Sequence, residues 1–147
     1  MEASREMNEK GLSFSSDAAS ELEVYQKAIR DVVDLTFAVF DKEDQKMARK
    51  VEPLEAVVND INAKIKNHHM QSGKCTIELG FILTDILTDF ERISDHCSNI
   101  AACVCQVYDG ELDTHQYLER VKNGDNQEFQ QEYQRLKEVY RLPDSAK

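Results

Sequence analysis

The chain has 147 residues, of which 41% are hydrophobic and 31% are charged, a composition typical of a globular protein with a real core. Its 28 acidic and 18 basic residues give a formal net charge of −10, which repels nucleic acid and anionic lipid head groups. No apolar run approaches the ~20 residues that a transmembrane helix needs. We therefore expect neither nucleic-acid binding nor direct membrane insertion by this chain.

Residues 1–16 are polar and end on a Ser-Ser-Asp sequence, which is typical of a helix N-cap. We expect this segment to be either a flexible lead-in or the remnant of a preceding repeat. Behind it, spacings of three and four predict a core-facing helix over residues 17–41. The positions that carry this stripe are Leu22, Tyr25, Ile29, Val32, Val33, Thr36, Phe37, Val39 and Phe40.

A second apolar stripe runs from Met47 to Ile65, after a charged break at residues 41–44, and predicts the second helix. Pro53 lies early in this helix. Because proline has no N–H to donate, it either kinks the helix or marks its first turn. Residues 70–74, which include Gly73, are predicted to form the turn that ends the helix.

The third stripe is the most regular, since its apolar residues alternate in steps of four and three over roughly 30 residues. Its members are Leu79, Leu83, Ile86, Phe90, Ile93, Cys97, Ile100, Val104 and Val107. With Phe90 and Cys97 at heptad position a, Ile93 and Ile100 fall at position d. These two isoleucines are therefore predicted to be core residues.

Two shorter helices are predicted after the third stripe, at residues 113–122 and 126–140, with a frayed tail at residues 142–147. No strand pattern competes with the helical spacings. The sequence thus predicts an all-α protein: an antiparallel three-helix bundle over residues 17–141 that includes additional short C-terminal helices.

Paired oxygen ligands occur on two of the predicted helices. Glu91 and Asp95 are four residues apart, and Glu55 and Asn59 repeat that spacing, so each pair shares one helix face. Such oxygens suit hard or borderline cations, with Asp89 a further candidate ligand. The alternative is that these side chains are only a solvated surface.

Other chemistry finds little support in the sequence. The chain contains none of the motifs GxxxxGK[ST], GxGxxG, GxSxG and HExxH, and it has no ExxH pair for a di-iron bundle site. Its four cysteines form no CxxC pair, which argues against a structural zinc site, and thiols of this kind suit a reducing cytoplasm. We expect no enzymatic activity.

The segment "DFERISDHCSNIA" at residues 89–101 strongly resembles the signature of PhoU domains, and "ARKVEPLEAVVNDIN" at residues 48–62 resembles the companion motif. The exact residues of "VEPLE" and "GKCTIELGFILTDILTDFERISDHCSNIA" look most like those of the PhoU domain of bacterial sodium/phosphate cotransporters. This resemblance implies a bundle of three helices, often present in tandem. It also implies that the chain is a fragment of a larger transporter.

Some PhoU proteins bind iron or zinc clusters through ExxxD motifs. Carried over by that resemblance, Glu91 and Asp95 match one motif fully, and Glu55 matches the first position of the other. Asn59 stands where the family usually has Asp, which implies a weaker or smaller cluster, because an amide supplies a neutral oxygen. Magnesium and manganese are the other cations that these oxygens suit.

The resemblance implies a regulatory domain of a sodium-dependent phosphate transporter, on the cytoplasmic side of the membrane, with the membrane domain in the same full-length chain. One alternative is a stand-alone PhoU regulator that damps an ABC-type phosphate importer and phosphate signalling. Another, from a different class, is a helical metal-storage or redox protein. Val33, Phe37 and Phe40 widen the first stripe beyond one seam, so we also expect a homodimer or docking to the transporter.

Overall fold

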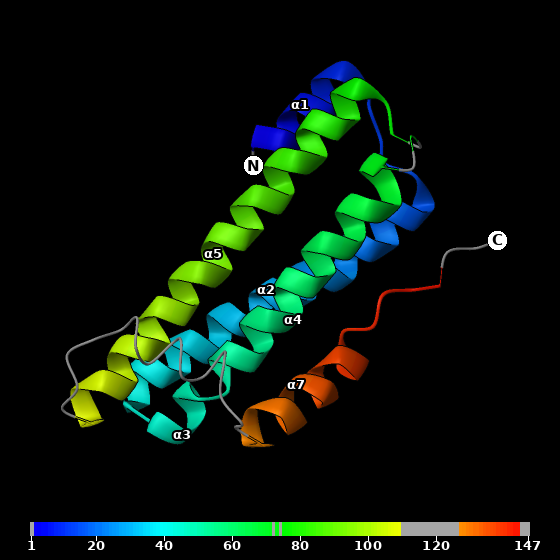
Figure 1. Ribbon diagram of the computed structural model, residues 1–147. Coiled ribbons are helices and arrows are strands. Elements are labelled where there is room, and N and C mark those ends of the chain that lie inside the picture. Colours follow the sequence, from blue (N-terminus) through cyan, green and yellow to red (C-terminus); the bar gives the residue numbers. More distant parts are fainter. Residues whose placement is uncertain (1, 72, 74, 110–126, 145–147) are drawn as a thin grey trace.

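Long antiparallel helices dominate the computed structural model, which describes residues 2–71, 73, 75–109 and 127–144 (Figure 1). In chain order the elements are α1 Glu2–Lys10, α2 Ser16–Lys42, α3 Gln45–Ala48, α4 Val51–Lys66, the π-helix η1 Asn67–Gln71, α5 Ile77–Asp109 and α7 Gln127–Val139. The predicted all-α fold is confirmed, and no strand occurs among these residues. The helix predicted at residues 113–122 lies outside the described residues.

Local signals in the sequence set the helix ends. The Ser15 hydroxyl accepts a hydrogen bond from the Ala18 amide at 3.2 Å and caps α2, which confirms the predicted start. Glu43 then ends α2 in the left-handed conformation, at φ +50°. Asp44 caps α3 by accepting from the Lys46 amide at 2.9 Å.

The second predicted helix is divided in two, since α3 ends at Ala48 and α4 begins at Val51. Pro53 is the third residue of α4, where an amide has no intrahelical acceptor in any case, so it marks the first turn. The predicted turn at residues 70–74 was placed slightly early, because η1 continues to Gln71. Gly73 does adopt a left-handed conformation, at φ +66°.

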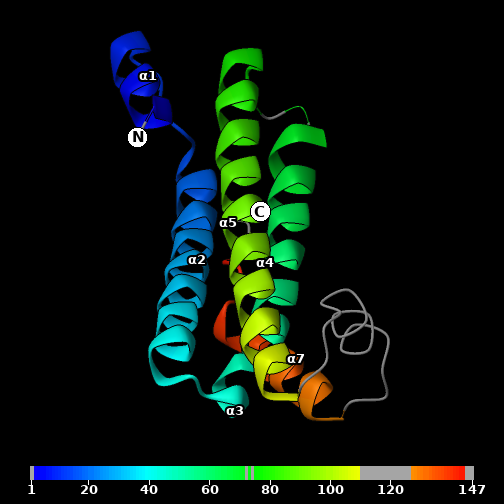
Figure 2. The same cartoon turned by 90° about the vertical axis from the view of Figure 1, so that its left-hand side faces the viewer.

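Helices α2, α4 and α5 pack against one another as a three-helix bundle, and α7 lies along α4 (Figures 1 and 2). Two tyrosines tie this segment to the bundle: Tyr133, in the middle of α7, donates to Asp60 of α4, and Tyr140, just after its end, donates to Asp31 of α2 at 2.5 Å. The central core residues are Tyr25, Ala28, Val32, Val39, Val51, Val57, Val58, Ile61, Ile65, Leu83, Leu87, Ala101 and Cys105. None of the helices among the described residues combines the length and apolar character that a membrane span requires.

The predicted core positions on α5 were partly wrong. Ile93 and Ile100, at heptad position d, are 37% and 42% exposed, whereas Ser94 and Ala101, one residue later, are 0% and 1% exposed. The buried face of α5 is therefore rotated by about one residue, or 100°, at its d edge. On that face Leu83, Leu87, Ser94 and Ala101 are buried, and the isoleucines lie at its edge.

Candidate metal centre

Two hydrogen bonds fix the register between the antiparallel helices α4 and α5. The amide of Asn62 donates to the carbonyl oxygen of Leu87 at 2.9 Å, and the Ser98 hydroxyl donates to Glu52. Glu55 is one turn beyond Glu52 on α4, so this register places it level with residues 94–95 of α5. By the same spacing, Asn59 is level with residues 90–91.

The acidic residues of α4 point into the bundle. Glu52 and Glu55 are only 1% and 2% exposed, because positions three apart share the face that α4 turns toward α5. The Asn59 side-chain amide donates to Glu55 Oε1 at 2.6 Å. A buried carboxylate is costly unless hydrogen bonds or a counter-charge compensate it, so this face is specialised for polar contacts.

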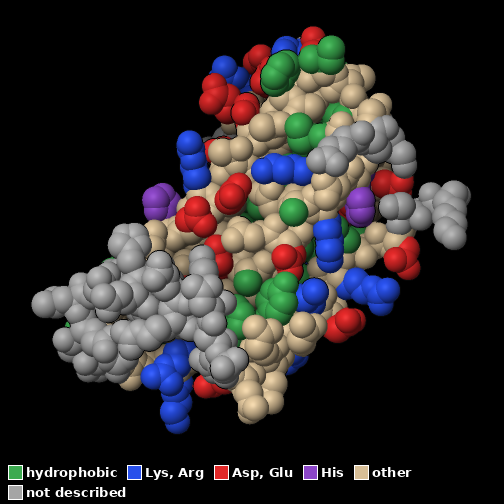
Figure 3. Space-filling view, viewed as in Figure 1, with side chains coloured by type: hydrophobic (Ala, Val, Ile, Leu, Met, Phe, Trp, Pro, Cys, Tyr) green, Lys and Arg blue, Asp and Glu red, His purple; other side chains and the backbone are tan. Residues whose placement is uncertain are grey.

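The residues of α5 that face this part of α4 differ in burial. Ser94 is fully buried, Glu91 is half-buried and Asp95 is exposed. Glu91 Oε2 lies 4.0 Å from Lys66 Nζ of α4, at the edge of the seam. Acidic and basic side chains alternate over the surface here (Figure 3). A cation entering from this edge would therefore meet both signs of charge.

The pKa of Tyr25 of α2 reflects both its burial and the negative charges of this seam. Burial is the main cause that raises the pKa of its phenol to about 12, and the negative charges of Glu91 and Asp95 raise the pKa further. The hydrogen bond that Tyr25 accepts from Asn62, at 2.9 Å, opposes this shift. The two predicted ligands on α5 thus create a negative potential that reaches into the core.

Among the buried oxygen atoms of the seam, Asn59 Oδ1 and Ser94 Oγ find no hydrogen-bond partner in the part of the chain that the structure describes. Asn59 is itself one of the predicted ligands, and the register places Ser94 level with Glu55 on the facing helix. Neutral and carboxylate oxygens with spare lone pairs are the ligand set that hard cations take. The seam thus offers oxygen atoms of the kind that a hard cation takes, but Glu55, Glu91 and Asp95 do not bring one oxygen each within 4.8 Å of one another.

The structure brings the predicted ligands together only in part. Glu55 and Asn59 are in direct contact, and Glu91 and Asp95 share the facing helix. Asp89 lies apart from them, because it lines a groove of about 980 Å³ that α1 and α2 form with the other side of α5. The metal-ligand role of all five residues stays a prediction.

Sequence reasoning missed several polar residues that the fold buries. Glu52 and Ser98 join the α4–α5 seam, and Glu21 of α2 contacts His68 and His69 of η1. The signal was present for Glu21, which is four residues before Tyr25 on the buried stripe of α2. A carboxylate at such a position predicts a buried polar partner.

The family model for the PhoU domain matches residues 22–104, which is more than half of the chain and includes most of α2, α4 and α5. The chain belongs to the PhoU domain family. This family is regulatory and is associated with the control of phosphate transport. The matched segment contains both helices of the polar seam, whereas α1 and α7 lie outside it. Comparison with curated proteins and with solved structures gave no match in either case.

Proposed function

We propose that this PhoU domain is the cytoplasmic regulatory domain of a sodium-dependent phosphate transporter, whose membrane domain belongs to the same full-length chain. The family match over residues 22–104 carries the proposal, because it covers most of the three-helix unit. The wording of the sequence around "VEPLE", at residues 51–55, supports the transporter branch. The domain acts by binding and is not catalytic.

The regulatory domain changes how fast the membrane domain transports phosphate. In cells without their own phosphate transporters, sodium-dependent uptake by the full-length protein should rise when Glu91→Gln and Asp95→Asn are introduced together. We expect the uptake rate to rise about five-fold or more, since five-fold is the lower end of ordinary allosteric coupling. The exposed pair Asp34→Asn and Asp41→Asn on α2 removes the same charge and should leave uptake unchanged.

Equal uptake by both double variants would contradict the proposed function. If uptake through an ABC-type importer changed instead, the chain would be a stand-alone regulator. Measuring both uptake routes in the same cells separates these outcomes.

The α4–α5 seam binds a hard cation through Glu55, Glu91 and Asp95, with Asn59 completing the shell. The carboxylates of Glu91 and Asp95 repel each other on one helix, and Glu55 adds a third negative charge opposite them. A bound cation converts this repulsion into attraction. The oxygens of Asn59 and Ser94, for which the described residues provide no hydrogen-bond partner, support the same conclusion.

Magnesium, manganese or ferric iron should raise the melting temperature of the domain. At a concentration 100-fold above Kd, the gain is about 2.7 kcal/mol by mass action. The Glu91→Gln, Asp95→Asn double variant should lose this gain, and Asn59→Asp should tighten binding by adding a charged ligand. The Asp34→Asn, Asp41→Asn variant is the control. An equal response from all proteins would place the bound ion elsewhere, and no response from any would exclude the site.

Several large apolar side chains of α2 and α5 are exposed among the described residues. Phe37 and Phe40 of α2 are 70% and 69% exposed, and Ile93, Ile100 and Val107 of α5 are 37%, 42% and 82% exposed. We call these five residues the α2–α5 face. Phe40, Ile100 and Val107 line one groove. Figure 2 shows α2 and α5 running side by side here. An apolar surface of this kind is typical of a protein interface.

A second copy of this chain covers the α2–α5 face. The face includes a groove of about 600 Å³ next to Phe40, and Glu43 is the one acidic residue among the described residues that line it. Phe37, 70% exposed and three residues before Phe40 on α2, is not among the described residues that line the groove. A projection and a hollow on one patch allow two copies to exchange the same contact about a two-fold axis.

A further inference from the structure

A buried carboxylate outside the seam holds two imidazoles. Glu21 of α2 is 2% exposed, and its two oxygens contact different histidines. The Oε1 atom lies 2.7 Å from His68 Nδ1, and Oε2 lies 2.5 Å from His69 Nε2. Among the described residues, this is the only group of three His, Cys, Asp or Glu ligand atoms that all lie within 4.8 Å of one another.

The two histidines lie on an unusual piece of backbone. His68 and His69 belong to a π-helical turn, Asn67–Gln71, that continues α4. Turns of this type are rare and occur frequently at functional sites. The π-helical turn is thus a second observation that points to a site.

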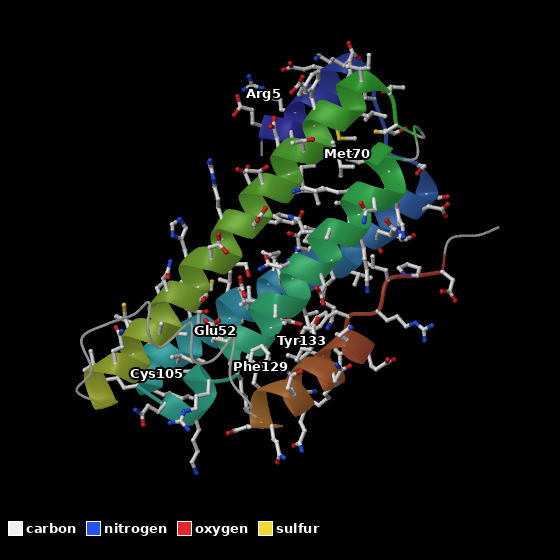
Figure 4. The ribbon with its side chains drawn as sticks, viewed as in Figure 1. Arg5, Glu52, Met70, Cys105, Phe129 and Tyr133 are labelled. Atoms are coloured by element: carbon white, nitrogen blue, oxygen red, sulfur yellow. The ribbon has the colours of Figure 1, made fainter. Side chains whose placement is uncertain are left out.

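This group is separate from the α4–α5 seam. Figure 4 labels Met70, next to the two histidines in the sequence, at one end of the α4–η1 helix and Glu52 near the other. The ligands also differ, because the seam offers oxygen atoms alone, whereas this group offers two imidazole nitrogens and one carboxylate. Nitrogen ligands favour borderline transition metals such as zinc over magnesium or calcium.

We propose that Glu21, His68 and His69 form a transition-metal site of the zinc class. Two histidines and one carboxylate are a ligand set that zinc takes with a fourth position left open. The His68 side chain is 43% exposed, which gives the metal a route in and leaves room for a water or an external ligand. The bound metal connects the beginning of α2 to η1.

The observed distances correspond to the metal-free state, in which protons bridge the nitrogens and oxygens. With metal–ligand bonds of about 2.0–2.1 Å in tetrahedral geometry, neighbouring ligand atoms are about 3.3 Å apart. The N–O distances of 2.7 and 2.5 Å must therefore open by about 0.6–0.8 Å when the metal replaces the shared protons. The exposed ring of His68 can make the movement that its own contact needs.

The alternative is that the three side chains form only a hydrogen-bonded tie between α2 and η1. A double variant separates the two roles. In His68→Asn the amide nitrogen replaces Nδ1 as a donor, and in His69→Gln it replaces Nε2, so both can still donate to Glu21. Amides are poor ligands for zinc. The double variant should therefore keep the tie and lose the metal.

The test is cobalt(II) titration followed by visible absorption, because four-coordinate cobalt with nitrogen ligands absorbs far more strongly than six-coordinate cobalt on oxygen ligands. The wild-type protein should develop this absorption at one equivalent, and zinc should displace it. The His68→Asn, His69→Gln variant and a Glu21→Gln variant should each bind at least about 100-fold more weakly, since even the loss of an outer-shell partner costs 10–100-fold.

Two controls keep this result independent of the seam. His96→Asn removes an exposed histidine of α5, and Glu91→Gln with Asp95→Asn removes the ligands of the seam; both proteins should retain the absorption. Weak absorption in the wild-type protein, or equal absorption in the His68→Asn, His69→Gln variant, would overturn the proposal. So would loss of the absorption in either control. Helical circular dichroism of every variant confirms that a lost signal does not come from unfolding.

Discussion

Leu87→Ala should lower the free energy of unfolding by about 2–5 kcal/mol, whereas Ile93→Ala should lower it by less than about 1 kcal/mol. Leu87 is 0% exposed on the face of α5 toward α4, so its truncation leaves a cavity that the surrounding helices cannot fill. Ile93 is 37% exposed and loses few contacts on truncation. Urea unfolding followed by circular dichroism measures both values.

This pair of variants tests the rotation of α5 directly. The heptad pattern predicts a large loss for Ile93, whereas the structure predicts it for Leu87. A loss for Ile93→Ala as large as that for Leu87→Ala would show that the d positions of the stripe are buried after all. The measurement should be made at low protein concentration, because Ile93 also belongs to the α2–α5 face.

Phe40→Asp should abolish self-association of the domain. The variant places a carboxylate from each copy in the centre of the proposed two-fold interface, where neither has a counter-charge. We expect the dimer dissociation constant to rise by at least about 100-fold, which corresponds to about 2.7 kcal/mol. Sedimentation velocity over a range of concentrations should show a dimer for the wild-type protein and a monomer for the variant.

Phe81→Asp is the matched control for this experiment. Phe81 of α5 is 70% exposed, nearly the same as Phe40 at 69%, but it does not belong to the α2–α5 face. The control should remain dimeric. A wild-type protein that sediments as a monomer at high concentration would contradict self-association, and equal effects of the two variants would place the interface elsewhere.

Local signals in the sequence determined where most helices begin and end. Ser15, Pro53 and Gly73 each act through their own backbone or through neighbours in the same turn, so their effects could be predicted without a tertiary structure. The missed break between α3 and α4 shows where this reasoning fails. The apolar spacing from Met47 to Ile65 continues through residues 49–50, although the helix does not.

The sequence also indicated the PhoU family and the acidic pair on α5, because both are carried by residues close together in the chain. The position of Glu55 along α4 relative to Glu91 and Asp95 on α5 was decided only in the folded structure. It depends on the contacts of Asn62 with Leu87 and of Ser98 with Glu52, which join α4 to α5 across 25 and 46 residues. Periodicity within one helix contains no information on such a register.

By itself the sequence determined the helices and the family, since hydrogen bonds within a helix and local motifs involve near neighbours. Tertiary structure alone decided which side of α5 is buried and what Glu21 contacts. A helix can rotate about its axis without changing its own hydrogen bonds, so its neighbours select the buried face. Glu21 meets His68 across 47 residues, and only the packing of α2 against α4 and η1 brings the two together.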